Sequence, residues 1–258
     1  MSRFILLFII ATLSSALSAD DKNIVLLDDY KYTPSSDAVE KLQQVITTGK
    51  TENKLVLAVF GAQWCHDSRA LSETFSIPDF HSQLQDKFAV QFVDVGYLEN
   101  RSEALSELNL IGFYGTPTVV IFDPVNNKVL NRQDHVDWTN AASKDYSAFE
   151  EYFLSDKFKI QSDAETLNPN QQKKMNTIKA FEQIQAKRLK RAYQKLSPLL
   201  KSYKENPEQD HEEFYAVWRE VRQFRIQLDS DIVGLIDSVK SAPEESITFP
   251  TYPSFSWE

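Results

Sequence analysis

The chain has 258 residues, with 28 lysines and arginines against 37 aspartates and glutamates, so its formal net charge is −9. An acidic chain without a basic stripe repels phosphate backbones, and we therefore expect no nucleic-acid partner. The length suffices for one large domain, or for one ordinary domain with an appendage.

The first 19 residues have the features of a secretory signal peptide. Arg3 precedes an apolar run from Phe4 to Ala11, and small residues follow up to Ala19. This order is typical of a cleaved export signal. A membrane anchor is the alternative, but a spanning helix needs about 20 apolar residues, and this run is shorter. We therefore expect an exported protein, periplasmic or secreted, without a stable membrane span.

Short apolar runs alternate with helix-like stretches in residues 20–158, which we assign to one domain. The predicted elements are an edge strand at 23–27, a helix at 36–48, a strand at 55–60, a helix from about 65 that breaks at Pro78 and resumes to 88, a strand at 89–95, a helix at 102–108, a strand at 118–122 with a hairpin partner at 128–131, and a helix at 143–153. Strands interleaved with helices imply an α/β fold, and the final hairpin makes its sheet mixed.

Residues 159–242 predict a helical hairpin. Apolar residues recur at helical spacing on both sides of a polar break at 204–210. Two amphipathic faces need covering, so we expect the hairpin to fold back onto the first domain; a partner-binding or dimerising arm is the alternative. The tail at 243–258 is rich in proline and aromatic residues. We expect it to lie in a groove of its own protein or to be disordered, with a docking peptide as the alternative.

The single cysteine, Cys65, stands in the stretch FGAQWCHDS, after an apolar strand and at the start of a helix. Unpaired N–H groups and the helix dipole favour a thiolate at the first turn of a helix. A protonated His66 adds to this effect, and Asp67 opposes it. A lone cysteine in an exported chain indicates either an intermolecular bond, of which a homodimer is one form, or a free reactive thiol.

Two short motifs together resemble the thioredoxin superfamily. They are Trp64-Cys65-x-x-Ser68 between a strand and a helix, and Thr116-Pro117 just before the strand at 118–122. The order Trp-Cys-His-Asp is similar to a branch of exported thioredoxin-like proteins. The resemblance implies a thioredoxin-like mixed sheet flanked by helices. It also implies a cis Pro117 beside Cys65 and substrate contacts from Trp64, Thr116 and Pro117.

The chain departs from the family pattern at two positions. Ser68 occupies the place of the resolving cysteine, and Val59 occupies a place where many thioredoxins carry a buried acid. Both departures weaken the case for a dithiol reductase. Ser68 can hydrogen-bond a Cys65 thiolate, but its hydroxyl cannot attack sulfur.

We therefore predict monothiol exchange, with Cys65 as nucleophile, Ser68 stabilising the thiolate and His66 tuning it. Attack on a disulfide gives a mixed disulfide, which a thiol of the client protein or a small thiol such as glutathione then releases. We expect no cofactor. The alternative is a redox-inactive binding module, such as a chaperone or assembly factor, because the fold alone does not determine function.

Metal binding by Cys65 and His66 is a third interpretation. Adjacent residues seldom both reach one ion, and the other histidines show no ligand spacing. We therefore predict no metal site.

Overall fold

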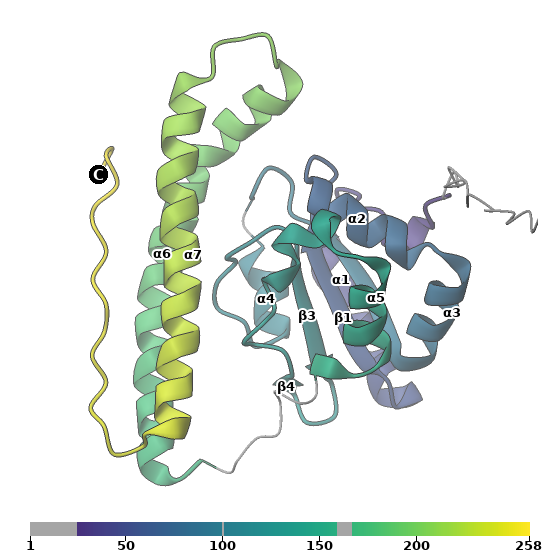
Figure 1. Cartoon of the computed structure of the whole chain (residues 1–258), viewed down its shortest axis with the longest axis horizontal. Coiled ribbons are helices and arrows are strands. Elements are labelled where there is room, and N and C mark those ends of the chain that lie inside the picture. Colours follow the sequence, from purple (N-terminus) through teal and green to yellow (C-terminus); the bar gives the residue numbers. More distant parts are fainter. Residues whose placement is uncertain (1–24, 100, 159–166) are drawn as a thin grey trace, which may run out of the picture.

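The computed structural model describes residues 25–99, 101–158 and 167–258. It consists of a mixed α/β domain and a long helical hairpin that lies beside it (Figure 1). The predicted signal peptide at 1–19 lies outside the described residues. Within these three ranges, every helix is too short or too polar to cross a membrane.

The domain is built on a four-stranded mixed sheet, which confirms the predicted fold class. Its strands are β1 (Leu55–Gly61), β2 (Phe88–Asp94), β3 (Thr118–Asp123) and β4 (Lys128–Val129), in the order β2-β1-β3-β4. Strand β1 is parallel to β2 and antiparallel to β3, and β3 is antiparallel to β4. The motif-bearing ends of β1 and β3 are therefore neighbours.

Helices flank both faces of the sheet. They are α1 (Ala38–Glu52), α2 (His66–Phe75), α3 (Pro78–Lys87), α4 (Ser102–Glu107) and α5 (Tyr146–Phe149), with 3-10 segments η1 (Asp28–Tyr30) and η2 (Asp137–Ser143) and a π-helical turn η3 (Glu150–Leu154). Pro78 is the first residue of α3. Proline has no backbone N–H to donate, so it is tolerated at a helix start and separates α3 from α2.

Strand β1 is buried on both faces, as its unbroken apolar run predicts. Val56, Ala58 and Phe60 belong to a core that also contains residues of α1, α4 and the hairpin. Leu57 and Val59 belong to a second core, with α2, α3 and the segment η2 to η3. The alternation of side chains along a strand places the two sets on opposite faces. The sheet is thus the middle layer of the domain.

Two predicted elements differ from the structure. The edge strand at 23–27 is wrong for its described residues, 25–27, which form no strand. The backbone N–H of Leu27 donates instead to the hydroxyl of Ser76 at 3.1 Å. The helix predicted at 143–153 starts only at Tyr146 and changes to a π-helical turn at Glu150.

The hairpin consists of α6 (Pro169–Glu205) and α7 (Glu212–Ser241). Its apolar residues share one core with the sheet face that carries Val56, Ala58 and Phe60. Near its C-terminal end, α6 changes direction and leans over the α/β domain (Figure 1). Pro198 lies inside this part of the helix. Its missing N–H and its ring disrupt regular helical bonding, which accounts for the bend.

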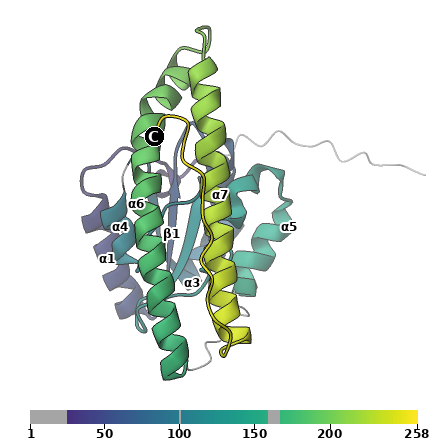
Figure 2. The same cartoon turned by 90° about the vertical axis from the view of Figure 1, so that its left-hand side faces the viewer.

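The tail at 243–258 runs back along the hairpin, on the side away from the α/β domain (Figures 1 and 2). Phe249 stacks on Phe181 of α6 with ring centroids 4.7 Å apart. The guanidinium of Arg188 lies over the rings of both Phe224 and Phe255, at 4.8 and 4.6 Å from their centroids. The tail therefore covers the outer face of the hairpin.

Candidate active site

Cys65 is the N-cap residue of α2, in the turn that follows β1. Its backbone N–H donates to the carbonyl of Ala62 at 3.1 Å, and its own carbonyl accepts the N–H of Arg69 at 3.1 Å. The thiol donates to the backbone carbonyl of Thr116 at 3.3 Å. The residue is 7% exposed. A bent turn thus presents the sulfur to the segment that leads into β3.

The peptide bond between Thr116 and Pro117 is cis. Phe60 near the end of β1 pairs with Thr118 at the start of β3, which brings this bond next to the Cys65 turn. The Thr116 side chain is buried, and its hydroxyl has no hydrogen-bond partner among the described residues. Thr116 therefore offers the site a hydroxyl as well as a carbonyl.

Ser68 lies in the first turn of α2 and is completely buried. Its hydroxyl oxygen accepts the backbone N–H of Ala62 at 3.3 Å. A Cβ on Gly61 would lie 2.6 Å from this oxygen, so a glycine is needed for the close approach. The stabilisation of the sulfur by Ser68 stays a prediction, because the thiol of Cys65 bonds to Thr116 in this structure.

His66 and Trp64 lie on either side of Cys65 in the chain and have different environments. The His66 side chain is 71% exposed, and its Nε2 lies 3.3 Å from Oδ2 of the buried Asp67. Asp67 also accepts the backbone N–H of Ala142 through Oδ1 at 3.0 Å. The indole N–H of Trp64 donates to the carbonyl of Gly96 at 2.7 Å. Trp64 is therefore fixed in place, while His66 lies at the rim.

A cleft of about 790 Å³ opens in front of Cys65. The domain contributes Trp64 to Asp67, Gly115 and Thr116, and residues of η2. The hairpin contributes the opposite wall, with Leu200, Tyr203, Lys204, Phe214, Tyr215, Trp218, Arg222, Arg225, Ile226, Asp229 and Ser230. Cys65, Trp64, His66 and Thr116 thus share one cleft, which the hairpin closes on one side.

The aromatic residues of the hairpin wall are site residues that the sequence patterns do not predict. Tyr203 stacks on Phe214 with ring centroids 4.4 Å apart, and Phe214 contacts Trp218 at 5.7 Å. Lys204 Nζ lies 5.9 Å from the ring centroid of Trp64, so the bent end of α6 reaches the Cys65 loop. The helical spacing of Phe214, Trp218 and Arg225 indicates that they lie near one face of a helix. It does not show which part of the protein that face covers.

Comparison with known proteins shows a similarity over part of the domain. Residues 37–124 match a protein-family model described as thioredoxin-like. This domain is thioredoxin-like. The match runs from the N-terminal end of α1 to the end of β3 and includes Cys65 and Pro117.

One solved structure is also similar to the chain. It is a disulphide isomerase from Xylella fastidiosa Temecula1, with 25% sequence identity and a TM-score of 0.42. The similarity covers 48% of this chain and 94% of the isomerase chain. No curated protein matches the sequence significantly.

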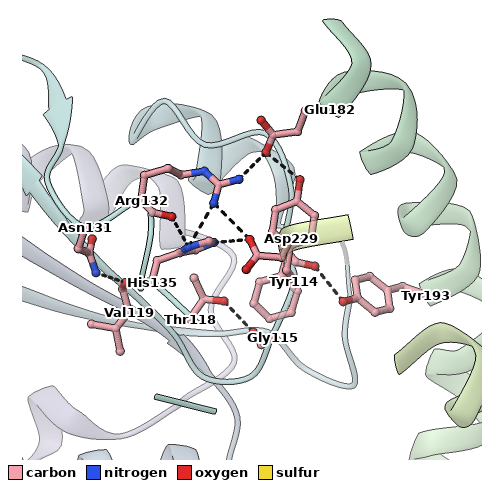
Figure 3. A network of polar contacts seen from close by, with 11 residues as sticks. Tyr114, Gly115, Thr118, Val119, Asn131, Arg132, His135, Glu182, Tyr193 and Asp229 are labelled. Carbon is pink, nitrogen blue, oxygen red and sulfur yellow. Dashed lines mark hydrogen bonds and ion pairs between the residues drawn. The ribbon is translucent and has the colours of Figure 1, made fainter. Parts of the chain in front are cut away.

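A buried polar network joins the thioredoxin-like domain to the hairpin (Figure 3). Arg132, in the segment after β4, contacts Glu182 of α6 at 3.0 Å and Asp229 of α7 at 3.2 Å. The hydroxyl of Tyr114 donates to the same Glu182 oxygen at 2.8 Å. His135 Nε2 lies 3.6 Å from Asp229. The network thus connects two segments of the domain to both helices of the hairpin.

Burial controls the protonation of this network. It lowers the pKa of His135 well below the ordinary value, and the nearby charge of Arg132 lowers it further, so His135 is neutral near pH 7. Burial also raises the pKa of Asp229, although Arg132 acts in the opposite direction. Burial alone would lower the pKa of Arg132, but Glu182, Tyr114 and Asp229 together raise it. Arg132 therefore stays charged between the two acids.

The histidine, cysteine and acidic side chains of the described ranges nowhere form a group of three or more that could hold a metal ion.

Proposed function

We propose that this protein carries out thiol–disulfide exchange through Cys65 alone and forms mixed disulfides with client proteins. The observation that carries the proposal is the position of the Cys65 sulfur, 3.3 Å from the carbonyl that precedes cis Pro117, at the start of α2 and at the edge of a cleft. The thioredoxin-like fold supports thiol–disulfide exchange in general terms.

The exchange conserves electrons. The Cys65 thiolate attacks one sulfur of a client disulfide, the client S–S bond breaks, and the other client sulfur leaves as a thiolate. The new bond joins Cys65 to the client. Ser68 has no sulfur with which to attack this bond. A second thiol of the client, or a small thiol such as glutathione, completes the reaction, and the first of these routes is an isomerisation.

The neighbouring residues have distinct roles in this proposal. Thr116 contributes its backbone to an extended client segment beside Pro117, and the hydrogen bond from the resting thiol to its carbonyl is replaced during attack. Trp64, held by Gly96, supplies a rigid surface at the cleft. His66 is exposed at the rim, and in this proposal it exchanges protons with the client thiol.

The proposal includes export of the protein to an oxidising compartment, where client disulfides form and persist. Its basis is the signal-peptide pattern of residues 1–19. The N-terminal sequence of protein recovered from its native host tests this part. A mature chain that begins near residue 20 supports export, and a chain that still begins at Met1 contradicts it.

The exchange itself is tested by trapping. Native extracts are incubated with the wild-type protein and with Cys65→Ser, free thiols are blocked, and complexes are separated on non-reducing gels. We expect disulfide-linked clients with the wild type and none with Cys65→Ser. The same gel shows whether two copies of the chain join through Cys65.

The buried position of Cys65 favours one competing function, a redox-inactive module that binds proteins through the cleft. Equal, negligible recovery of disulfide-linked proteins by the wild type and Cys65→Ser would exclude exchange and leave this binding module. Non-covalent recovery of the same proteins by both variants would then support it.

A further inference from the structure

Two buried polar side chains without hydrogen-bond partners line the cleft from opposite walls. On the domain side, Thr116 is 7% exposed and its hydroxyl is unpartnered among the described residues. On the hairpin side, Arg225 is 8% exposed, and its Nε and Nη1 groups also lack partners within the described ranges. Both groups donate hydrogen bonds. The cleft therefore presents unpaired hydrogen-bond donors on both of its walls.

The charge of Arg225 is also uncompensated. Its guanidinium lies over the ring of Trp218, 5.2 Å from the centroid, and also interacts with the hydroxyl of Tyr193, but it forms no ion pair with any described residue. A buried cation is costly unless an anion or several hydrogen bonds accompany it. The nearby Asp229 does not compensate this charge, because it is engaged by Arg132 at 3.2 Å.

The other charged residues of the cleft are divided between its walls, with acids on the domain side and cations on the hairpin side. Asp67 is held by His66 and by the N–H of Ala142. Asp137 also lines the domain wall. Lys204 and Arg222 lie at the exposed mouth of the hairpin wall, and neither forms an ion pair within the described residues. The hairpin wall is therefore positive and the thiol faces it.

The remaining hairpin wall is aromatic. The stacked pair of Tyr203 and Phe214, followed by Trp218, gives an apolar surface next to Arg225. A volume of about 790 Å³ falls within the roughly 300–1,000 Å³ of sites that enclose small ligands. It fits a short extended segment of a client rather than a folded surface.

We propose that the cleft selects client segments that carry an acidic residue beside the reacting cysteine. Arg225 binds the carboxylate, the Thr116 hydroxyl donates to a backbone acceptor, and an apolar client side chain packs on Tyr203 and Trp218. This inference rests on the proposed exchange at Cys65 and adds the sequence preference of its clients. The hairpin, which is absent from the matched 37–124 region, is thereby the specificity element.

The test uses the full chain and three synthetic peptides. Each peptide has a phenylalanine and one cysteine capped with thionitrobenzoate, and they differ only in having aspartate, asparagine or lysine beside the cysteine. Cys65 attacks the peptide sulfur, the S–S bond of the cap breaks, and coloured thionitrobenzoate leaves as the thiolate. Its release gives the second-order rate constant. A small neutral disulfide, dithiodipyridine, measures the reactivity of Cys65 by itself.

We expect the wild type to react with the aspartate peptide about tenfold faster than with the asparagine peptide, and slowest with the lysine peptide. Arg225→Met keeps an unbranched, flexible side chain but removes the guanidinium and its charge, and its aspartate-to-asparagine ratio should fall to near one. Arg219→Met is the matched control, because Arg219 is exposed on the same helix and lies outside the cleft. It should retain the wild-type ratio. The wild-type ratio should also fall as salt is added.

Three outcomes separate the inference from the proposed function. Equal rates with the three peptides, combined with a reactive thiol toward dithiodipyridine, would overturn the acidic preference and leave the exchange intact. A wild type no more reactive than Cys65→Ser toward every disulfide would overturn both. A preference for oxidised glutathione over the aspartate peptide, lost in Arg225→Met, would show a small-thiol site and overturn the assignment to client segments. Circular dichroism of each variant confirms that it is folded.

Discussion

Arg132 Nη2 lies 3.0 Å from Oε1 of Glu182, and this contact joins the thioredoxin-like domain to α6 within a buried network (Figure 3). The second Nη group of Arg132 reaches Asp229 of α7 at 3.2 Å. One arginine therefore holds both helices of the hairpin, and with them the wall that faces Cys65.

Arg132→Met should destabilise the protein strongly. The variant leaves Glu182 and Asp229, each with only 9% of its side chain exposed, without their cation. Removal of one partner from a buried ion pair costs about 3–5 kcal/mol, and urea unfolding should show this loss. Lys195→Met is the control, because it removes the exposed pair with Glu213, and it should cost less than about 1 kcal/mol. Equal urea midpoints for the two variants would contradict the role of Arg132.

Asp134 should make stability fall as the pH rises. Burial raises the pKa of Asp134 to about 6 in the folded protein, while an unfolded aspartate has a pKa of about 3.9. Between about pH 4 and 6 the folded state therefore holds a proton that the unfolded state has lost, and the free energy of unfolding decreases by on the order of 2 kcal/mol. Asp134→Asn removes this carboxyl, so its stability should change less over this range. Profiles that run parallel would contradict the prediction.

The fold was predictable because its strongest patterns are local. The run at 55–60 predicts a strand covered on both faces, and β1 is buried toward both cores. Pro78 predicts the break that separates α2 from α3. The prediction of a strand at 23–27 is wrong for its described residues. An apolar run alone does not show whether its backbone groups pair with another strand.

The site was predictable only on its domain side. Cys65 and Thr116 belong to short motifs, and the pairing of β1 with β3 brings them together. The hairpin wall depends on how α7 docks, which no local pattern specifies. The sequence does contain a signal for Arg225 and Asp229, because these charged residues stand beside the apolar positions Phe224 and Leu228 of an amphipathic helix. Charges at the edge of an apolar stripe are buried only if a partner element covers them.

Pro198→Ala should increase the accessibility of Cys65. Proline bends α6 toward the domain, where Lys204 lies over Trp64 and Tyr203 lines the cleft. Alanine restores regular helical bonding, which should draw this end of α6 away from the cleft. We expect alkylation of Cys65 by iodoacetamide to become several-fold faster. Ser197→Ala, which retains the proline, should alkylate at the wild-type rate, and an unchanged rate in Pro198→Ala would show that the bend does not shield the thiol.

Ser68→Cys should shorten the life of the mixed disulfides. A cysteine at this position, in the first turn of α2, supplies the sulfur that the site lacks, and its attack on the Cys65–client bond releases reduced client. Because this attack is intramolecular, we expect trapped complexes to decrease by at least about tenfold.

The substitution also has a structural cost, and the control accounts for it. The serine hydroxyl accepts the N–H of Ala62 at 3.3 Å, so its loss destabilises the turn by about 1 kcal/mol. Ser68→Ala has the same loss without a new thiol and should retain its trapped complexes. Equal amounts of trapped complex with Ser68→Cys and Ser68→Ala would contradict the prediction. The absence of a second sulfur would then not limit release of the client, and Ser68 would not prolong the mixed disulfides.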